Sequence, residues 1–197
     1  GLLPGGLLQV RTSVHHRDMK NTIVLGGTGF VGAHVCEKLV RDGWRVTVPT
    51  RRRSHAQSIV HLPGLTVLEM DVHDEVALQK ACAGQTALVN LVAILHGSAA
   101  AFQHAHVQLA RTIARACSHA GVRRLVHISA LGADPQGPSL YQRSKAQGET
   151  VLRNALLDLT ILRPSVIFGA EDKFLNLIAD LQAVFPFMPL AGSGPRF

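Results

Sequence analysis

The sequence is poor in cysteine, in aromatic residues and in long apolar segments. Its 197 residues include three Cys, seven Phe, one Tyr and one Trp. Three cysteines are too few, and odd in number, for a disulfide framework. Each lies in an apolar stretch with helical spacing, which favours a reducing compartment. No apolar run reaches the roughly 20 residues that a membrane-spanning helix needs, so we expect no membrane span.

Charged residues make up only 17% of the chain, but their balance is positive, with a formal net charge of +7. Such a balance can attract nucleic acid, an anionic membrane surface or a phosphorylated ligand. The basic residues are scattered except at 51–53 and 123–124. Aromatic residues do not alternate with them, as a surface for single-stranded nucleic acid requires. We therefore expect no nucleic-acid partner and favour a small phosphorylated ligand.

Short apolar segments alternate with helical patterns along the chain. The expected strands are 22–25, 44–48, 65–70, 87–92, 125–128 and 159–162. The expected helices are 31–39, 76–83, 99–120, 141–156 and 173–184. Strands that are apolar throughout are typical of a parallel sheet covered on both faces. The pattern predicts an α/β fold with a doubly wound parallel sheet.

A chain of this length can bury about 70% of its surface in one core, and we expect a single domain over residues 20–185. Residues 1–19 show no periodicity and are interpreted as a leader or remnant without ordered structure. Their Pro and Gly residues make them a poor signal peptide. Residues 186–197 are interpreted as the start of a substrate-binding region that is cut short.

Three glycines follow the first expected strand at a spacing of three residues: Gly26, Gly29 and Gly32. The first suits a sharp turn out of the strand, the second a close approach of backbone to a pyrophosphate, and the third tight helix–strand packing. The start of the next helix offers N–H groups and partial positive charge to phosphates. The context predicts a Rossmann dinucleotide site rather than a simple glycine-rich turn.

The end of the second expected strand selects between dinucleotides. NAD-binding folds carry Asp or Glu about 20 residues beyond the glycines, where it binds the ribose 2′-hydroxyl. Here Thr50 is followed by Arg51 and Arg52, with no carboxylate. An Arg can bind a 2′-phosphate through two parallel hydrogen bonds. We therefore predict that NADP(H) is preferred over NAD(H), the alternative being a solvated basic turn.

Tyr141 and Lys145 lie four residues apart, on one face of an expected helix. An adjacent ammonium group can lower a phenol pKa towards the neutral range, which predicts an acid–base pair. Ser129 ends the fifth expected strand and could donate to a substrate carbonyl, or else cap backbone groups. Ser139 and Ser144 are lesser candidates, and Ser139 could instead cap the helix.

Eleven histidines raise the question of a metal site. His104 and His106 are two residues apart, which on a helix directs them differently, and no pair has the spacing of a zinc-binding helix. Asp71 and Asp74 are read as a loop residue and a helix cap rather than as paired catalytic carboxylates. We predict no metal.

The segments 26–32, 71–72, 90–93, 141–145 and 163–169 together carry a resemblance. They resemble the short-chain dehydrogenase/reductase superfamily in its extended, epimerase-like branch. The segments 141–149 and 168–176 are similar to an atypical subgroup. That subgroup contains the NADPH-binding accessory subunit of respiratory complex I and its bacterial relatives. The resemblance extends from about residue 21 to the end of the chain.

The resemblance implies roles by position. The pyrophosphate would be bound by Gly26, Thr28, Gly29, Phe30 and Val31. Arg51 and Arg52 would bind the 2′-phosphate, Asp71 the adenine amino group and Val72 the adenine ring. The adenosine ribose would be lined by Leu91, Val92 and Ala93. Tyr141 and Lys145 would reach the nicotinamide ribose and the substrate. The nicotinamide would be flanked by Pro164, Ser165 and Val166.

Three functional hypotheses follow. The first is an NADP(H)-dependent oxidoreductase acting on a small carbonyl or alcohol, with Tyr141, Lys145 and Ser129 as catalytic residues. The loop from Ser129 to Tyr141 is shorter than in sugar-nucleotide epimerases of this branch, which argues against that activity. The second is a non-catalytic accessory or assembly protein of a respiratory or quinone-related complex, and the third is a dinucleotide-sensing regulator. We expect a cytoplasmic protein of bacterial type, which could lie peripherally at the inner membrane, with a homodimer possible through the helices 99–120 and 141–156.

Overall fold

The structure, a computed structural model, describes residues 20–164. Within this range six parallel strands form one sheet in the order β3-β2-β1-β4-β5-β6. The strands are β1 (Asn21–Leu25), β2 (Arg45–Thr50), β3 (Leu65–Glu69), β4 (Ala87–Asn90), β5 (Arg124–Ile128) and β6 (Asp158–Leu162). The helical elements are α1 (Phe30–Arg41), η1 (Arg53–Ala56), α2 (Glu75–Cys82), α3 (Ala99–Phe102), η2 (Gln103–Gln108), α4 (Leu109–Ala120) and α5 (Leu140–Arg153). The strand order reverses between β1 and β4, as in Rossmann folds, so the predicted fold class is confirmed.

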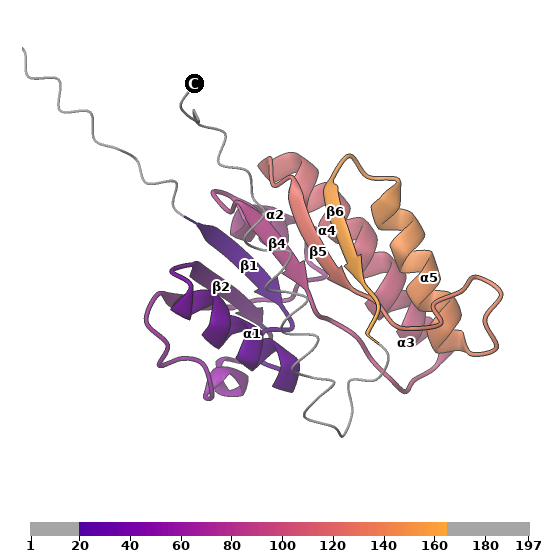
Figure 1. Cartoon of the computed structure of the whole chain (residues 1–197), viewed down its shortest axis with the longest axis horizontal. Helices are drawn as coiled ribbons and strands as arrows, with labels where there is room; N and C mark the ends of the chain where they lie inside the picture. Colours follow the sequence, from indigo (N-terminus) through magenta and orange to yellow (C-terminus); the bar gives the residue numbers. More distant parts are fainter. Residues whose placement is uncertain (1–19, 165–197) are drawn as a thin grey trace, which may run out of the picture.

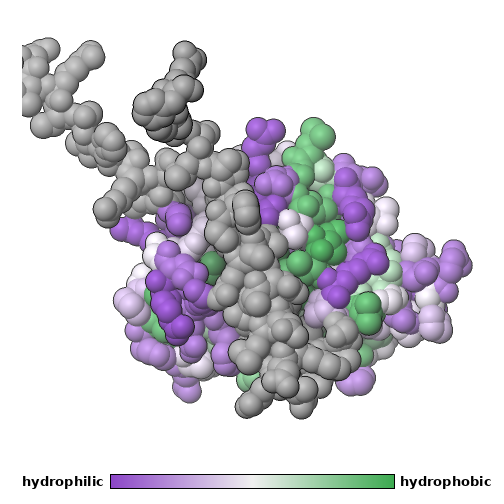
Figure 2. Space-filling view, in the orientation of Figure 1, coloured by the Kyte–Doolittle hydropathy of each residue, from purple (hydrophilic) through white to green (hydrophobic). Residues whose placement is uncertain are grey.

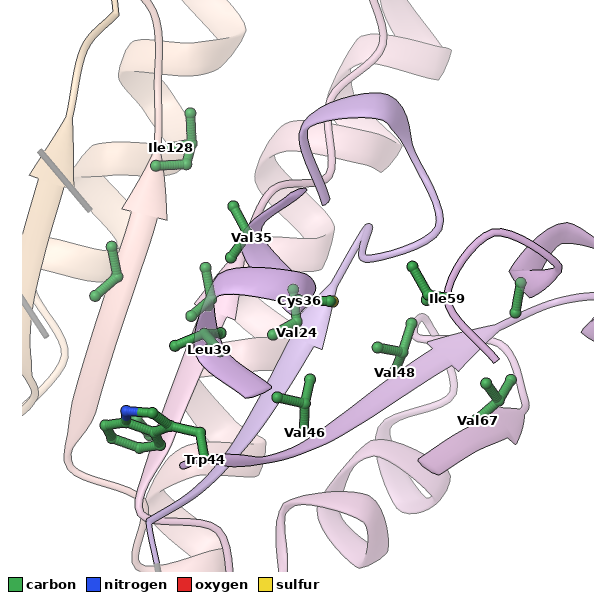
Figure 3. Close-up of a cluster of buried hydrophobic side chains, with 14 residues drawn as sticks. Val24, Val35, Cys36, Leu39, Trp44, Val46, Val48, Ile59, Val67 and Ile128 are labelled. Atoms are coloured by element: carbon green, nitrogen blue, oxygen red, sulfur yellow. The ribbon is translucent and has the colours of Figure 1, made fainter. Parts of the chain in front are cut away.

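Helices cover both faces of the sheet (Figure 1). Alternate residues of one strand enter different cores, because successive side chains of a strand point to opposite faces. Val24 of β1 packs with α1, in a cluster that also includes Trp44 (Figure 3). Its neighbours Ile23 and Leu25 lie in the second cluster, with α2, α4 and α5. Burial on both faces explains why the strands read as continuous apolar runs.

Strand β4 ends two residues earlier than predicted. The Oδ1 atom of Asn90 accepts a hydrogen bond of 3.1 Å from the Val92 N–H, which removes that group from the sheet ladder. Only the Leu91 N–H still bonds to the neighbouring strand, at the carbonyl oxygen of Leu25. The segment that begins at Leu91 is therefore a loop at the carboxyl edge of the sheet.

The single helix expected over 99–120 is a continuous helical segment with a change of winding. It comprises α3, a π-helical segment η2 and α4. Ser98 caps the start through the Ala101 N–H, and Gly121 ends the segment with φ of 75°. Apolar spacing alone did not reveal the wider π winding in the middle.

The boundaries of α5 and the path after β2 also differ from the prediction. Helix α5 begins with a capping box between Ser139 and Gln142, which confirms the capping role considered for Ser139. It ends at Arg153, not at 156, because the chain turns at Asn154 to begin β6. The unpredicted η1 places Ala56 in the core, in a polar stretch without apolar periodicity.

All three cysteines of the chain, Cys36, Cys82 and Cys117, are free and fully buried. No helix in residues 20–164 is long and apolar enough to cross a membrane. Several expectations lie outside the described residues: the leader 1–19, the helix 173–184, Ser165, Val166 and the region 186–197.

Candidate functional site

The carboxyl ends of β1 and β4 lie side by side at the point where the strand order reverses. The registers pair Leu25 with Asn90, and the Leu91 N–H donates to the Leu25 carbonyl at 2.9 Å. Doubly wound sheets bind ligands in the crevice that opens outside such strand ends. The predicted site residues of the described range therefore have to be judged by their position relative to this edge.

The glycine turn between β1 and α1 has the conformation that its residues predict. Gly26 has φ of 79°, a left-handed value that glycine adopts without steric cost. The Gly29 N–H donates to the Gly26 carbonyl at 3.1 Å and closes the turn. A Cβ atom on Gly32 would lie 2.6 Å from Gly27 Cα, so the helix packs against the turn only with glycine there. The conformational reasons given for Gly26 and Gly32 are confirmed.

Gly29 differs from its two neighbours. Its φ of −74° is open to any residue, and a Cβ atom there would meet only the Gly26 carbonyl oxygen, at 3.4 Å. No side chain caps the first turn of α1, and no acidic residue lies in that turn. Thr28 and Val31 beside it are half-buried, and Phe30 is 70% exposed. The surface thus offers helix-terminal amides and open space, which fits a pyrophosphate.

Arg51 and Arg52 directly follow β2 and are exposed, as is Arg53. Within residues 20–164 none of the three forms an ion pair, so their guanidinium groups can serve an external anion. The Thr50 hydroxyl donates to the Arg52 carbonyl at 3.1 Å and shapes the turn. The nearby carboxylate of Glu69, which sequence reasoning missed, accepts the Arg53 N–H at 2.9 Å.

The loop after β3 lies beside this basic turn. Asp71 accepts the His73 N–H at 2.9 Å, and Asp74 caps α2 through the Ala77 N–H, as a loop residue and a cap should. Burial, with a smaller contribution from His104, lowers the pKa of His73, on which the charges of Asp71 and Arg51 also act. The structure therefore brings the residues predicted for adenine and for the 2′-phosphate together.

Two histidines that the sequence did not single out as a pair meet at this end of the sheet. The rings of His73 and His104 stack with centroids 3.7 Å apart and planes 16° from parallel. His104 is also joined to Gln108 by a hydrogen bond of 2.9 Å at Nδ1. Among the described residues no group of three or more His, Cys, Asp or Glu side chains could hold a metal ion.

Tyr141 and Lys145 lie on the first two turns of α5, beside the end of β5. Lys145 is 1% exposed, and its Nζ donates to the Ile128 carbonyl at 2.8 Å. Burial lowers the pKa of Lys145 to about 8, against the opposing effect of Glu149. Burial has the opposite effect on the half-buried Tyr141 phenol, whose pKa it raises.

The structure shows no lowering of the Tyr141 pKa by Lys145, so that effect stays a prediction. The Lys145 ammonium is directed at the end of β5, where it binds the Ile128 carbonyl. Burial is what shifts the Tyr141 pKa, and it disfavours the charged phenolate. An α-helical spacing of four residues places two side chains on one face but does not decide which partner each one binds.

Ser129 is 2% exposed, and its Oγ has no hydrogen bond of regular geometry within the described chain. The hydroxyl is nevertheless close enough to Glu149 to help lower the pKa of that carboxyl group. A group that polarises a carbonyl must be accessible to the substrate. The catalytic role of Ser129 stays a prediction, and its burial weakens it.

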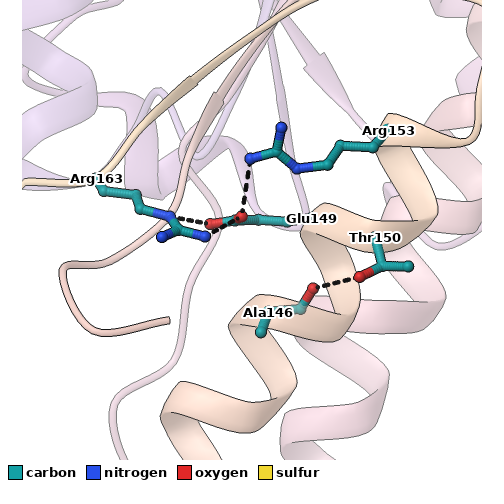
Figure 4. A network of polar contacts seen from close by, with 5 residues as sticks. All are labelled: Ala146, Glu149, Thr150, Arg153 and Arg163. Carbon is teal, nitrogen blue, oxygen red and sulfur yellow. Dashed lines mark hydrogen bonds and ion pairs between the residues drawn. The ribbon is translucent and has the colours of Figure 1, made fainter. Parts of the chain in front are cut away.

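Glu149 joins α5 to the end of β6 (Figure 4). Its carboxylate accepts two hydrogen bonds from Arg163, at 2.8 and 2.6 Å, and a longer one of 3.4 Å from Arg153. Burial raises the pKa of Glu149, but the hydrogen bonds from Arg163 and Arg153 and the nearby Ser129 hydroxyl outweigh it, and the pKa is lowered overall. Pro164 follows directly, and its carbonyl accepts the Leu131 N–H at 3.1 Å.

A buried histidine completes the polar layer under the crevice. The Asn90 amide nitrogen lies 3.1 Å from His127 Nδ1, which must accept because an amide NH₂ can only donate. Burial, together with the charge of Lys145, lowers the pKa of His127 to about 3. Beyond Asn90, Leu91 and Val92 are half-buried and Ala93 is exposed along the crevice loop.

The sheet order, the glycine turn and the uncapped helix start define a Rossmann dinucleotide-binding protein. The family described as NAD(P)H-binding matches residues 26–178. The chain therefore belongs to this NAD(P)H-binding family.

Two curated relatives illustrate the range of similar proteins. The mitochondrial NADH dehydrogenase (ubiquinone) 1 alpha subcomplex subunit 9 of Mus musculus is 36% identical over 176 residues, which are 87% of this chain and 46% of that protein. The ceramide reductase of Caulobacter vibrioides is 29% identical over 88% of this chain and 54% of its own length. The chain thus spans about half the length of the curated relatives that it matches.

Solved structures show the same fold. A putative NAD-dependent epimerase/dehydratase from Bacillus halodurans superposes with a TM-score of 0.69 at 21% identity, over 77% of this chain and 73% of that one. The Bordetella bronchiseptica enzyme WbmG in complex with NAD superposes with a TM-score of 0.65 at 24% identity, over 76% and 54% of the two chains.

Two alanine substitutions in the glycine turn should affect different properties, the first stability and the second NADPH binding. Gly32→Ala should lower the free energy of unfolding by about 1–3 kcal/mol, because its Cβ overlaps the turn. Gly29→Ala should leave stability within about 0.5 kcal/mol but weaken NADPH binding, because the methyl group occupies the space at the amides. Urea unfolding and calorimetric titration measure the two quantities. Equal NADPH affinity of Gly29→Ala and wild type would contradict this assignment.

Glu149→Gln should lower stability near neutral pH by about 1–3 kcal/mol, because Arg163 loses its charged acceptor. The lowered pKa of Glu149 means that its contribution is present above the ordinary Glu value of about 4.3 and is lost as pH falls through the folded value. Urea unfolding at a series of pH values should show the difference shrinking in acid. Glu75→Gln, which breaks a solvent-exposed pair with Arg115, is the control and should change stability by less than about 1 kcal/mol. A pH-independent difference for Glu149→Gln would refute the assignment.

Proposed function

We propose that the chain is the dinucleotide-binding part of an NADP(H)-dependent oxidoreductase that acts on a small carbonyl or alcohol. The observation that carries the proposal is the position of Tyr141, half-buried beside the carboxyl end of β5 and one helical turn from buried Lys145. The glycine turn and the basic turn after β2 lie along the same edge of the sheet. This arrangement offers a phosphate end, an adenine end and a proton donor in one crevice.

The residues present fit a dinucleotide with a 2′-phosphate. The pyrophosphate would be held by Gly26, Thr28, Gly29, Phe30 and Val31, and the 2′-phosphate by Arg51 and Arg52. Asp71 and Val72 would contact adenine, and Leu91, Val92 and Ala93 the adenosine ribose. Pro164, with Ser165 and Val166 beyond the described range, would flank the nicotinamide. A guanidinium group without a competing carboxylate partner favours NADP(H) over NAD(H).

Bound in this way, the dinucleotide supplies or accepts hydride at its nicotinamide ring. Tyr141 would give its phenolic proton to the carbonyl oxygen as hydride reaches the carbonyl carbon, and take a proton back in the reverse direction. The buried ammonium of Lys145 would stabilise the negative charge that Tyr141 acquires. The sheet edge and α5 fix these groups before the substrate arrives, which removes the cost of orienting them.

A second function is favoured by one observation, the 36% identity to a mitochondrial complex I subunit. Under this alternative the dinucleotide is held tightly as a structural ligand, and the protein serves a respiratory or quinone-related assembly. A dinucleotide-sensing regulator would instead change its partner affinity between NADP⁺ and NADPH. Redox cycling of bound cofactor on addition of candidate carbonyls separates the oxidoreductase from both alternatives.

Arg51→Ala should weaken NADPH binding by about 10–100-fold and leave NADH binding within about threefold, because one charge-assisted contact to a phosphate is lost. Isothermal titration with both nucleotides measures the four dissociation constants. Arg123→Ala, which removes a charge from the other basic pair, is the matched control and should not discriminate between the nucleotides. Equal wild-type affinities for NADPH and NADH would exclude the preference.

Tyr141→Phe should reduce hydride transfer by about 10²–10⁴-fold, the contribution of a positioned acid, with NADPH affinity retained. The probe is the oxidation of NADPH by para-nitrobenzaldehyde, followed by absorbance with full-length protein. Full turnover in the Phe variant would eliminate Tyr141 as the acid. Tight NADPH binding without turnover of any carbonyl by wild type would favour the accessory role.

A further inference from the structure

His106 lies between two parts of the candidate site that are distant in sequence. It is 4% exposed and sits in the π-helical segment η2. Its Nε2 atom lies 3.2 Å from the backbone nitrogen of Ile94, in the loop after β4. Its Nδ1 atom lies 2.8 Å from the hydroxyl of Ser144, in the first turns of α5. One imidazole ring therefore bridges the crevice loop and the helix that carries Tyr141.

The hydrogen-bond partners fix the tautomer of this ring. The Ile94 N–H can only donate, so Nε2 must be the acceptor and carries no proton. Ser144 donates its own proton to the Tyr141 carbonyl at 2.9 Å, so its oxygen is left to accept from Nδ1–H. The bonds thus run in one direction, from His106 through Ser144 to the Tyr141 backbone. Because both ring nitrogens have defined roles, His106 acts here as a neutral Nδ1–H imidazole.

The charges around the ring agree with the neutral form. Lys145 acts on His106 from α5, and the neutral ring of His127 neighbours it from β5. Burial, together with the positive charge of Lys145, lowers the pKa of His106 to about 4. The imidazole therefore keeps the same hydrogen-bond pattern across the neutral pH range.

Backbone packing brings the ring to this position. A Cβ atom on Gly148 would collide with the carbonyl oxygen of His106, so η2 and α5 approach each other only because that residue is glycine. His106 lies in the π segment η2, and π segments are frequent at functional sites. Gly148 therefore leaves the space that the close approach of η2 and α5 requires.

The ring also contacts Tyr141 directly. The centroids of His106 and Tyr141 are 5.6 Å apart with planes at 79°, an edge-to-face arrangement. Phe102 completes a trio, with centroids 5.6 Å from His106 and 6.2 Å from Tyr141. The phenol is thus held through its own ring as well as through the backbone of its helical turn.

We propose that His106 is a positioning residue for Tyr141. It locks the first turns of α5 to the crevice loop at Ile94 and holds the phenol in its half-buried place at the carboxyl edge. Its effect on rate depends on the oxidoreductase function proposed above, whereas its effect on Tyr141 does not. A histidine that only satisfied the Ile94 N–H would leave the phenol unchanged when the link to Ser144 is cut.

The first test follows Tyr141 itself in full-length protein with isotope-labelled tyrosine. Tyr141 is the only tyrosine of this chain, and Tyr141→Phe assigns its signal. In wild type the phenol pKa should lie above the ordinary value of about 10, because burial raises the pKa of Tyr141. His106→Leu and Ser144→Ala should each shift it back towards that value, whereas exposed His119→Leu should not. Nitrogen NMR should show His106 as the Nδ1–H tautomer.

The second test measures rate with NADPH and para-nitrobenzaldehyde. His106→Leu and Ser144→Ala should each lower kcat by about 10–100-fold, since small misplacements of a reacting group have effects of this size, with the Kd of NADPH within about threefold. Their double variant should lose little more than either single one, because both cut the same link. His106→Gln, which keeps an acceptor within reach of Ile94 but not the Nδ1 donor, should not restore kcat.

The outcomes separate the two proposals. An unchanged Tyr141 titration in folded His106→Leu and Ser144→Ala, or an Nε2–H tautomer in wild type, overturns the positioning role whatever the enzyme does. Should wild type turn nothing over while the titration shifts as expected, the oxidoreductase function fails and the positioning role stands. If His106→Leu does not fold, Ser144→Ala and the wild-type tautomer still decide.

Discussion

A buried ammonium group organises the half of the molecule on which catalysis would depend. Lys145 is the largest fully buried side chain of residues 20–164, and an unpaired charge in such a place would be costly. The Ile128 carbonyl and the Glu149 carboxylate compensate that charge. Each of them ties α5 to the sheet, Ile128 at β5 and Glu149 through Arg163 at β6. Burial, aided by the same positive charge, keeps the two nearby histidines, His106 and His127, neutral.

Local sequence patterns were sufficient for most of the fold. Continuous apolar runs predicted all six strands of the described range, because burial on both faces leaves little room for polar residues. Glycine spacing predicted the turn after β1, where φ at Gly26 and the contact at Gly32 require it. The patterns failed where a side chain redirects the backbone. Asn90 ends β4 by binding a backbone N–H, and η1 buries Ala56 from a stretch without apolar periodicity.

The candidate site was predicted less completely than the fold. The location of the site residues along one edge could be predicted from the topology, since the carboxyl ends of parallel strands meet there. The hydrogen-bond partner of each side chain could not be predicted. Lys145 binds a strand carbonyl, and Ser129 is buried near Glu149. His106 was considered only as a metal ligand and Glu149 was not singled out, because residues 38 and 14 positions away supply their partners. Contacts between side chains that are distant in the sequence depend on three-dimensional proximity, which the spacing of residues within one helix cannot predict.

Complete burial of the three thiols has a practical consequence for spectroscopy. Burial, aided by the charge of Glu37, raises the pKa of Cys36 to about 12, which leaves almost no reactive thiolate at neutral pH. The bond to Cys117 lowers the pKa of Cys82, but all three side chains are 0% exposed, so the fold shields them from maleimide dyes and spin labels. A cysteine engineered at an exposed position such as Leu131, shortly after the end of β5, would take up a fluorophore selectively without removal of any native residue from the core.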